Sequence, residues 1–429
     1  AAFSVMKLIK FTILTNMIIL NINKKTIKLI FSSIFIIVFL IDLFTVNDFF
    51  ISKLIPHTFK VIFADLVTII PSINELDQIY LLGAEKISSN EISGRPMNYP
   101  DIWVYIFNGL KMFGNPVYIF GILQIIIYLI FSKIILIKNK SFFFLYFLVL
   151  FSPTMILMME RGNNDLSIFF ILFLSIISRN YLSGLLLGLA ISLKIFPIVL
   201  VPAFIILNKV NKKFLLGFLT TIPFIIWALL NIKTSITNTD VVASFHASFG
   251  IYSLSMFLIK FLQDMFLINL SKEYLFFINL IFIFLFIILS IFFNYFFKKD
   301  LIHILNILEK NKKDFVLFIL FSTQVILVFF AFSNYAYRIV FLLIPLLIFI
   351  KNINNFIKFN NVKKISFTLL ASAPFLTPWI ILSFNETAKN HHIWVLYSVI
   401  TFITFIFYFT LLSKFYFKKI EQFFQYIKL

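Results

Sequence analysis

Apolar segments of membrane-spanning length recur along the whole chain and constrain its fold more than any other feature. A transmembrane helix needs roughly 20 predominantly apolar residues. The sequence of 429 residues is 61% hydrophobic. No polar stretch in it approaches the roughly 100 residues that a soluble domain takes. We therefore predict an all-α polytopic integral membrane protein.

Lysine residues indicate which side of the membrane each loop occupies. Lys24, Lys25 and Lys28 precede the first clear span, residues 29–44, and later lysine clusters also fall in short loops. The positive-inside rule then gives about twelve spans with both chain ends in the cytoplasm. The formal charge of +19 is explained by topology and by contacts to anionic membrane lipid, so we expect no nucleic-acid partner.

The spans divide the chain into three parts. We expect a cytoplasmic leader in residues 1–28, with Met6 as a candidate start, one transmembrane domain in residues 29–414, and a cytoplasmic tail in residues 415–429. The longest polar stretch, residues 48–101, forms the first external loop. This loop is rich in carboxylates, which makes it a candidate lip of an external active site.

A polar knot, residues 160–165, lies between two strongly apolar segments. Ionisable side chains at membrane depth are costly and usually face a bundle interior, a cavity or a substrate. Asn164 or Asp165 can cap the helix that follows, whose free amides then favour an anion. Arg161 adds a positive charge suited to phosphate. Capping does not explain Glu160 and Arg161 together, so we expect function here.

Asp65 is the candidate general base. It stands among apolar residues in the first external loop, and an apolar wall raises the pKa of a carboxylate towards the range useful for proton transfer. The alternative explanation, which the chemistry alone favours, is a helix N-cap or a loop-side ion pair. Glu75 and Asp77 are weaker candidates that fit a solvated turn.

Two more cations are candidates for binding phosphate. Lys194 interrupts an apolar run and either binds phosphate as a point charge or snorkels to the interface. Arg338 follows Tyr335 and Tyr337, whose rings either stack on a sugar or an isoprenoid or anchor the chain at the interface.

Residues 102–113 form an amphipathic segment that we predict to lie along the membrane interface. Pro100 before Asp101 is an ordinary helix start. Trp103 fits an interface anchor. The chain has no Cys, and its adjacent His391 and His392 have poor spacing for a metal on one helix, so we expect neither a metal nor a cofactor.

At the polar knot the chain resembles polyprenol-phosphate-dependent glycosyltransferases of the GT-C superfamily, in particular glycosyltransferase family 87, which includes bacterial membrane mannosyltransferases. The matching residues are Arg161-Gly162-Asn163-Asn164-Asp165, Gly184, Gly188-Leu189-Ala190, and Leu193-Lys194 with Pro197. Asp65 before Gly94 and Tyr99-Pro100, and the run Asn334-Tyr335-Ala336-Tyr337-Arg338 before a late span, agree in order. The family often has Tyr-Pro-Pro where this chain has Pro100-Asp101. Loose spacing leaves Glu75 or Asp77 as alternative counterparts of Asp65.

The resemblance implies a GT-C-like helical bundle in the bacterial inner membrane. The enzyme would move a sugar from a polyprenyl-phosphate donor to a hydroxyl of a lipid or glycan acceptor on the extracytoplasmic face. Asp65 would be the general base, and Arg161, Lys194 and Arg338 would neutralise the leaving phosphate. The remaining candidates for substrate binding are Asn163, Asn164, Asp165, Tyr99, Tyr335 and Tyr337. Two alternatives stay open: a lipid or glycolipid flippase or transporter, and a glycan polymerase or ligase.

Overall fold

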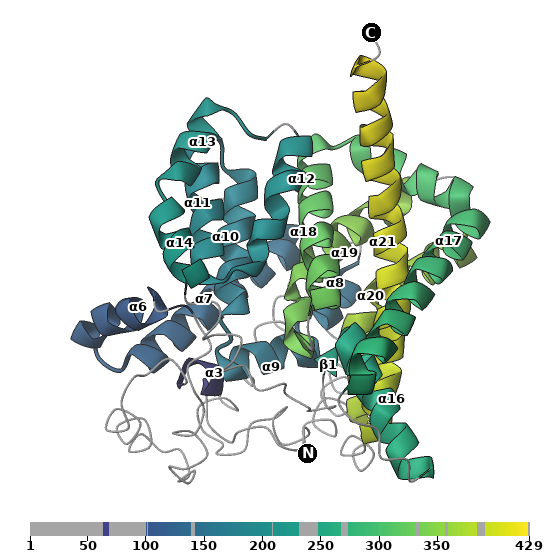
Figure 1. The fold of residues 1–429 in the computed structure, drawn as a ribbon, viewed down its shortest axis with the longest axis horizontal. Coiled ribbons are helices and arrows are strands. Elements are labelled where there is room, and N and C mark those ends of the chain that lie inside the picture. The colour runs from purple at the N-terminus through teal and green to yellow at the C-terminus, as the bar shows by residue number, and fades with distance from the viewer. Residues whose placement is uncertain are drawn as a thin grey trace, which may run out of the picture. The chain divides into compact units, whose positions relative to one another are not determined.

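The structure, a computed structural model, describes residues 63–67, 100, 102–138, 142–207, 209–230, 248–266, 273–331, 334–356, 359–383 and 391–427. These residues belong to one compact unit, Ile51–Leu429. They are almost entirely helical, which confirms the predicted fold class (Figure 1). The predicted leader, the first span and most of the first external loop, with Tyr99, Glu75 and Asp77, lie outside them.

Six helical segments of the described residues are long and apolar enough to cross a membrane. They are α7 (Pro116–Lys138), α8 (Phe143–Leu150) together with α9 (Pro153–Arg161), α17 (Glu273–Glu309), α18 (Lys312–Ala331), α20 (Asn361–Ser383) and α21 (His391–Ile427). A seventh results if α13 (Lys212–Leu219) and α14 (Ile222–Leu230), bent by 47°, form one span. The count of twelve for the whole chain stays a prediction.

Shorter elements accompany these spans. The apolar ones are α10 (Asp165–Ile177), α11 (Asn180–Leu193), η2 (Phe196–Val199) with α12 (Leu200–Ile206), and α19 (Val340–Asn352) with η4 (Ile353–Asn355). The others are α3 (Ala64–Val67), α6 (Ile102–Leu110) with η1 (Lys111–Phe113), α16 (Ile251–Phe266) and η3 (Ala336–Ile339). Strand β1 (Ser248–Phe249) pairs antiparallel with β2 (Asn334–Tyr335), and this ribbon leads directly into η3.

Helices α10, α11 and α13 pack side by side (Figure 1) because small residues line their contacts. A Cβ atom at Gly184 would collide with the carbonyl oxygen of Phe214, and one at Gly217 would collide with that of Tyr181. Ser175 and Ser183 donate hydrogen bonds to each other's carbonyl oxygens, at 2.8 and 2.7 Å. Small residues at membrane-helix contacts allow such close backbone approach.

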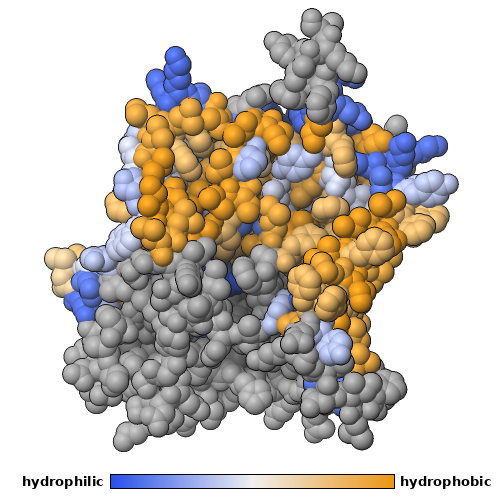
Figure 2. All heavy atoms as spheres, in the orientation of Figure 1, coloured by the Kyte–Doolittle hydropathy of each residue, from blue (hydrophilic) through white to orange (hydrophobic). Residues whose placement is uncertain are grey.

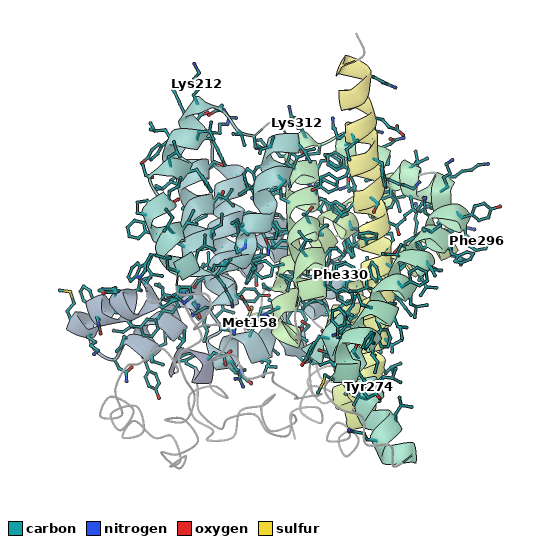
Figure 3. All side chains as sticks on the ribbon, in the orientation of Figure 1. Met158, Lys212, Tyr274, Phe296, Lys312 and Phe330 are labelled. Atoms are coloured by element: carbon teal, nitrogen blue, oxygen red, sulfur yellow. The ribbon has the colours of Figure 1, made fainter. Side chains whose placement is uncertain are left out.

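Apolar side chains dominate the described part of the face shown in Figure 2. On α17, for example, Phe276, Phe284 and Phe296 are 63%, 67% and 71% exposed, as expected of a helix that faces lipid. The labelled Lys212 and Lys312 lie at one end of the bundle, and Met158 of α9 lies towards the other (Figure 3).

The α17 helix kinks at Phe297 and continues to Glu309. Away from α9 and α10, three ion pairs among the described residues connect different helices: Lys351 with Asp314, Lys363 with Asp300, and Lys418 with Glu309. These pairs are partly exposed, so each contributes less than about 1 kcal/mol. Helix α21 runs without interruption past the predicted domain end at residue 414.

Candidate functional site

The site begins where α9 ends. Gly162 adopts the left-handed conformation, with φ 60° and ψ 37°. The N–H of Asn163 donates to the carbonyl oxygen of Met158, and that of Gly162 donates to Met159, both at 3.1 Å. This is a Schellman turn, which favours glycine because of the positive φ. It reverses the chain and presents Arg161 and Asn163 on either side of the turn.

Two glycines make room for the short helix α3 beside this turn. A Cβ atom at Gly121 would lie 2.6 Å from the ring of Phe63, and one at Gly162 would lie 2.8 Å from Leu66. Phe63, itself at φ 58°, donates its N–H to the carbonyl oxygen of Glu160 at 2.8 Å. These contacts hold Asp65, on α3, against the end of α9.

Asp65 is buried, and both of its carboxylate oxygens accept hydrogen bonds from residues of the polar knot. Its Oδ1 accepts hydrogen bonds from Arg161 Nε at 2.9 Å and Nη2 at 2.5 Å, and its Oδ2 accepts from Asn163 Nδ2 at 2.6 Å. Burial by itself raises the pKa of this carboxyl, but the Arg161 charge and the hydrogen bonds outweigh it and hold the pKa below its ordinary value of 3.8. The predicted rise in the pKa of Asp65 is therefore wrong, because its neighbourhood is cationic rather than an apolar wall.

Asn163 joins this pair to the start of α10. While its Nδ2 donates to Asp65, its Oδ1 accepts a hydrogen bond from the backbone N–H of Asp165 at 2.8 Å. The prediction that Asn164 or Asp165 caps α10 through its side chain is wrong, since no cap hydrogen bond comes from Asn164 and the Asp165 carboxylate is bound elsewhere. Asn163 captures the free amide instead, so the Asp165 side chain stays available for other partners.

Asp165 is completely buried and binds two cations from distant parts of the chain. Lys194 Nζ lies 2.5 Å from its Oδ1, and Arg338 Nε lies 3.2 Å from its Oδ2. Lys194 also lies over the ring of Phe196, 5.4 Å from its centroid. A lysine bound in this way does not snorkel to the interface, and phosphate binding by Lys194 stays a prediction.

A proline explains why Lys194 leaves its helix. Pro197 lacks an N–H, and its ring would clash with the carbonyl of Leu193 in a continuous helix. Helix α11 accordingly ends at Leu193, and Lys194 is extended, with φ −160° and ψ 120°. The extended backbone lets its side chain reach Asp165 on the neighbouring helix.

The five charged side chains form one cluster in which Lys194 and Arg338 are the most exposed members. Side-chain exposure is 0% for Asp165, about equal at 8% and 9% for Arg161 and Asp65, 13% for Lys194 and 25% for Arg338. We call these five residues and Asn163 the charged cluster.

The structure brings together six of the residues predicted from the sequence, across positions 65 to 338. Asn164 is buried next to them, and its side-chain amide atoms make no hydrogen bond within the described residues. Tyr335 and Tyr337 lie in the β2 and η3 segment that delivers Arg338, but their side chains, like Tyr99, lie outside the described residues. Among described residues no group of three His, Asp or Glu side chains could hold a metal ion.

Two polar side chains near the cluster were missed or misinterpreted in the sequence. Gln124 of α7 donates to Ser167 at 2.8 Å and to the carbonyl oxygen of Asn163 at 3.4 Å. Trp103 is 1% exposed and donates to the carbonyl oxygen of Leu193, so its predicted role as an interface anchor is wrong. The sequence signal for Gln124 was a lone Gln in an apolar helix. The signal for Trp103 was Pro197, which has no N–H to bond the carbonyl of Leu193.

A sequence model of glycosyltransferase family 87 matches residues 109–299 of the chain. The matched part contains Arg161, Asn163, Asp165 and Lys194 of the charged cluster. This similarity confirms the resemblance seen at the polar knot and supports a membrane glycosyltransferase. No curated protein and no solved structure matches the chain significantly.

Proposed function

We propose that this protein transfers a sugar from a polyprenyl-phosphate donor to a hydroxyl of a lipid or glycan acceptor on the extracytoplasmic face of a bacterial inner membrane. The observation that carries the proposal is the charged cluster, in which Asn163 bridges a buried carboxylate and a helix start that holds two cations. Sugar transfer from a lipid phosphate needs both a proton acceptor and positive charge for the departing phosphate.

Asp65 is the proposed base. With its pKa held low it is ionised at neutral pH, and it can accept a proton from the acceptor hydroxyl. In the resting site its two oxygens are occupied by Arg161 and Asn163. We expect the donor phosphate to attract Arg161 away from Asp65, which frees an oxygen of Asp65 and raises its basicity.

Lys194 and Arg338 are the proposed phosphate ligands. Both are held by one carboxylate, so their positions are set before substrate arrives. Donors fixed in advance at the place where negative charge develops stabilise the transition state without a reorganisation cost. Asn164, Tyr99, Tyr335 and Tyr337 remain proposed contacts to the sugar or to the lipid.

The proposal is tested by sugar transfer in membranes that contain the protein. Radiolabelled polyprenyl-phosphate mannose, glucose and arabinose are supplied, and the Asp65→Asn variant is compared with wild type. We expect at least one donor to be used, with a loss of about 100-fold or more in the variant, because a positioned base contributes that much. Asp314→Asn is the matched control, since it removes one carboxylate from a Lys351 pair outside the charged cluster.

Two results would contradict the proposal. Undiminished transfer by a well-folded Asp65→Asn protein would move the base to another residue. A folded wild type that used none of these donors would contradict the proposed donor class. Lipid translocation and transfer from pyrophosphate-linked oligosaccharides would then be measured.

A further inference from the structure

Trp103 connects the amphipathic helix α6 to the end of α11. Its indole Nε1 donates a hydrogen bond of 2.9 Å to the carbonyl oxygen of Leu193, 90 residues further along the chain. Its ring also makes an edge contact with Phe120 of α7, with centroids 5.6 Å apart. The tryptophan is therefore fixed between three helices.

The carbonyl of Leu193 needs a donor from outside its own helix. In an α-helix its partner would be the N–H of the residue four positions later. That residue is Pro197, which has no N–H. An unpaired carbonyl buried among apolar side chains is costly, and more so in a membrane. The indole of Trp103 supplies the hydrogen bond that Pro197 cannot.

The same hydrogen bond fixes the backbone immediately before Lys194. The N–H of Lys194 donates to the carbonyl oxygen of Ala190 at 3.0 Å, so its peptide unit is held by helix α11 on one side and by Trp103 on the other. The Lys194 side chain reaches Asp165 from this fixed point. We propose that Trp103 is a positioning residue for Lys194 and that it acts on the reaction without touching the substrate.

The chain offers a matched control for this contact. Trp379 of α20 also donates its indole N–H to a backbone carbonyl, that of Leu148, at 3.0 Å. This carbonyl too lies beside a proline break, since Pro153 begins the next helix, α9. Within the described contacts, neither Trp379 nor Leu148 touches the charged cluster. Phenylalanine at either position removes the donor and keeps an aromatic ring.

The first readout is kinetic and rests on the proposed function. We expect Trp103→Phe to lower kcat by about tenfold, with KM changed by less than about twofold, because Lys194 acts mainly on the charge of the leaving phosphate. Trp379→Phe should change neither parameter by more than about twofold. In a Lys194→Gln background the Trp103→Phe change should have little further effect. A tenfold loss that persists there would overturn the positioning role.

The second readout does not depend on any activity. Hydrogen exchange measured by mass spectrometry on peptides covering residues 188–200 should be faster in Trp103→Phe than in wild type, and unchanged in Trp379→Phe. Unchanged exchange in Trp103→Phe would overturn the inference even if sugar transfer were impaired. If wild type transferred no sugar while exchange rose as expected, the proposed function would fail and the structural role of Trp103 would stand.

Discussion

Asp65 and Arg161 restrain each other in the resting site. The guanidinium occupies one carboxylate oxygen through two hydrogen bonds, and the carboxylate keeps the guanidinium from other anions. A phosphate that competes for Arg161 would release both groups for reaction at once. Under the proposed function, donor binding and activation of the base would therefore be linked through the ion pair of Arg161 with Asp65.

The pH dependence of kcat/KM follows from the lowered pKa of Asp65. Its folded-state pKa lies below 3.8, so the ion pair stabilises the protein fully above that pH and is lost as pH falls through the folded pKa. We expect the acid limb of kcat/KM to lie below about pH 4 in wild type. In Arg161→Gln the limb should move to higher pH, since a stabilising charge is removed.

Transfer rates across a pH series, with protein integrity checked at each point, measure this limb. An acid limb of kcat/KM at about pH 6 in wild type would contradict this prediction. It would mean that the base is a group with a raised pKa, as expected of a desolvated carboxylate.

At this scale the sequence revealed the reactive residue types but not their pairing. Six residues of the charged cluster were identified as candidates, because charged and amide side chains stand out in apolar surroundings. Their partners depend on contacts between residues 96 and 173 positions apart, as in Arg161 with Asp65 and Arg338 with Asp165. The pKa of Asp65 was predicted in the wrong direction for the same reason.

Helix breaks in this fold are completed by side chains from other elements. Trp103 donates a hydrogen bond to the carbonyl oxygen of Leu193, which Pro197 leaves without a helical partner. Near Pro153, Trp379 and Tyr128 donate to the carbonyl oxygens of Leu148 and Leu150, respectively. Backbone groups at membrane depth must be satisfied within the protein, so each break requires such a partner.

Close packing of α11 on α13 can be tested at its glycines. Ala at Gly184 places a methyl group against the carbonyl of Phe214, so we expect Gly184→Ala to destabilise the protein by about 1–3 kcal/mol. A Cβ atom at Gly109 of α6 would meet no other atom within 4 Å, and Gly109→Ala should be neutral or slightly stabilising. Thermal unfolding in detergent measures both, and equal Tm values for the two variants would contradict the packing.

Some element boundaries follow directly from the sequence. Helices α7 and α10 begin and end within about a residue of the apolar stretches 115–137 and 166–178. Their ends coincide with changes from apolar to polar residues, which a sequence displays directly. The 47° bend between α13 and α14 lies next to Pro223, which has no N–H to bond the carbonyl of Leu219, so the sequence signals a break there but not its angle.

On the scale of the whole molecule, charge separates the two ends of the bundle. Lys212 and Lys312 lie at one end, and α9 with its polar turn lies towards the other (Figure 3). The positive-inside rule assigns the lysine end to the cytoplasm, which would leave the charged cluster nearer the extracytoplasmic face. The six or seven candidate spans of the described residues agree with the polytopic fold predicted from apolar segment lengths.

Single cysteines can test this orientation, since the chain contains no Cys. Cysteines at Lys212 or Lys312, both exposed, should react with a membrane-impermeant maleimide only when the cytoplasmic side is accessible, as in inverted vesicles. Cysteine at the exposed Asn108 of α6 should react in intact spheroplasts. Labelling of position 312 in intact spheroplasts would reverse the assignment.

The side-chain amide of Asn163 also limits which substitutions this part of the charged cluster can accept. It spans the gap between the Asp65 carboxylate and the first amide of α10 with one hydrogen bond at each end. A side chain one methylene longer would push the Asp65 carboxylate and the N–H of Asp165 apart. A side chain without an amide would leave both groups without these hydrogen bonds. The separation between Asp65 and the start of α10 is thus set by one residue that needs no charge of its own.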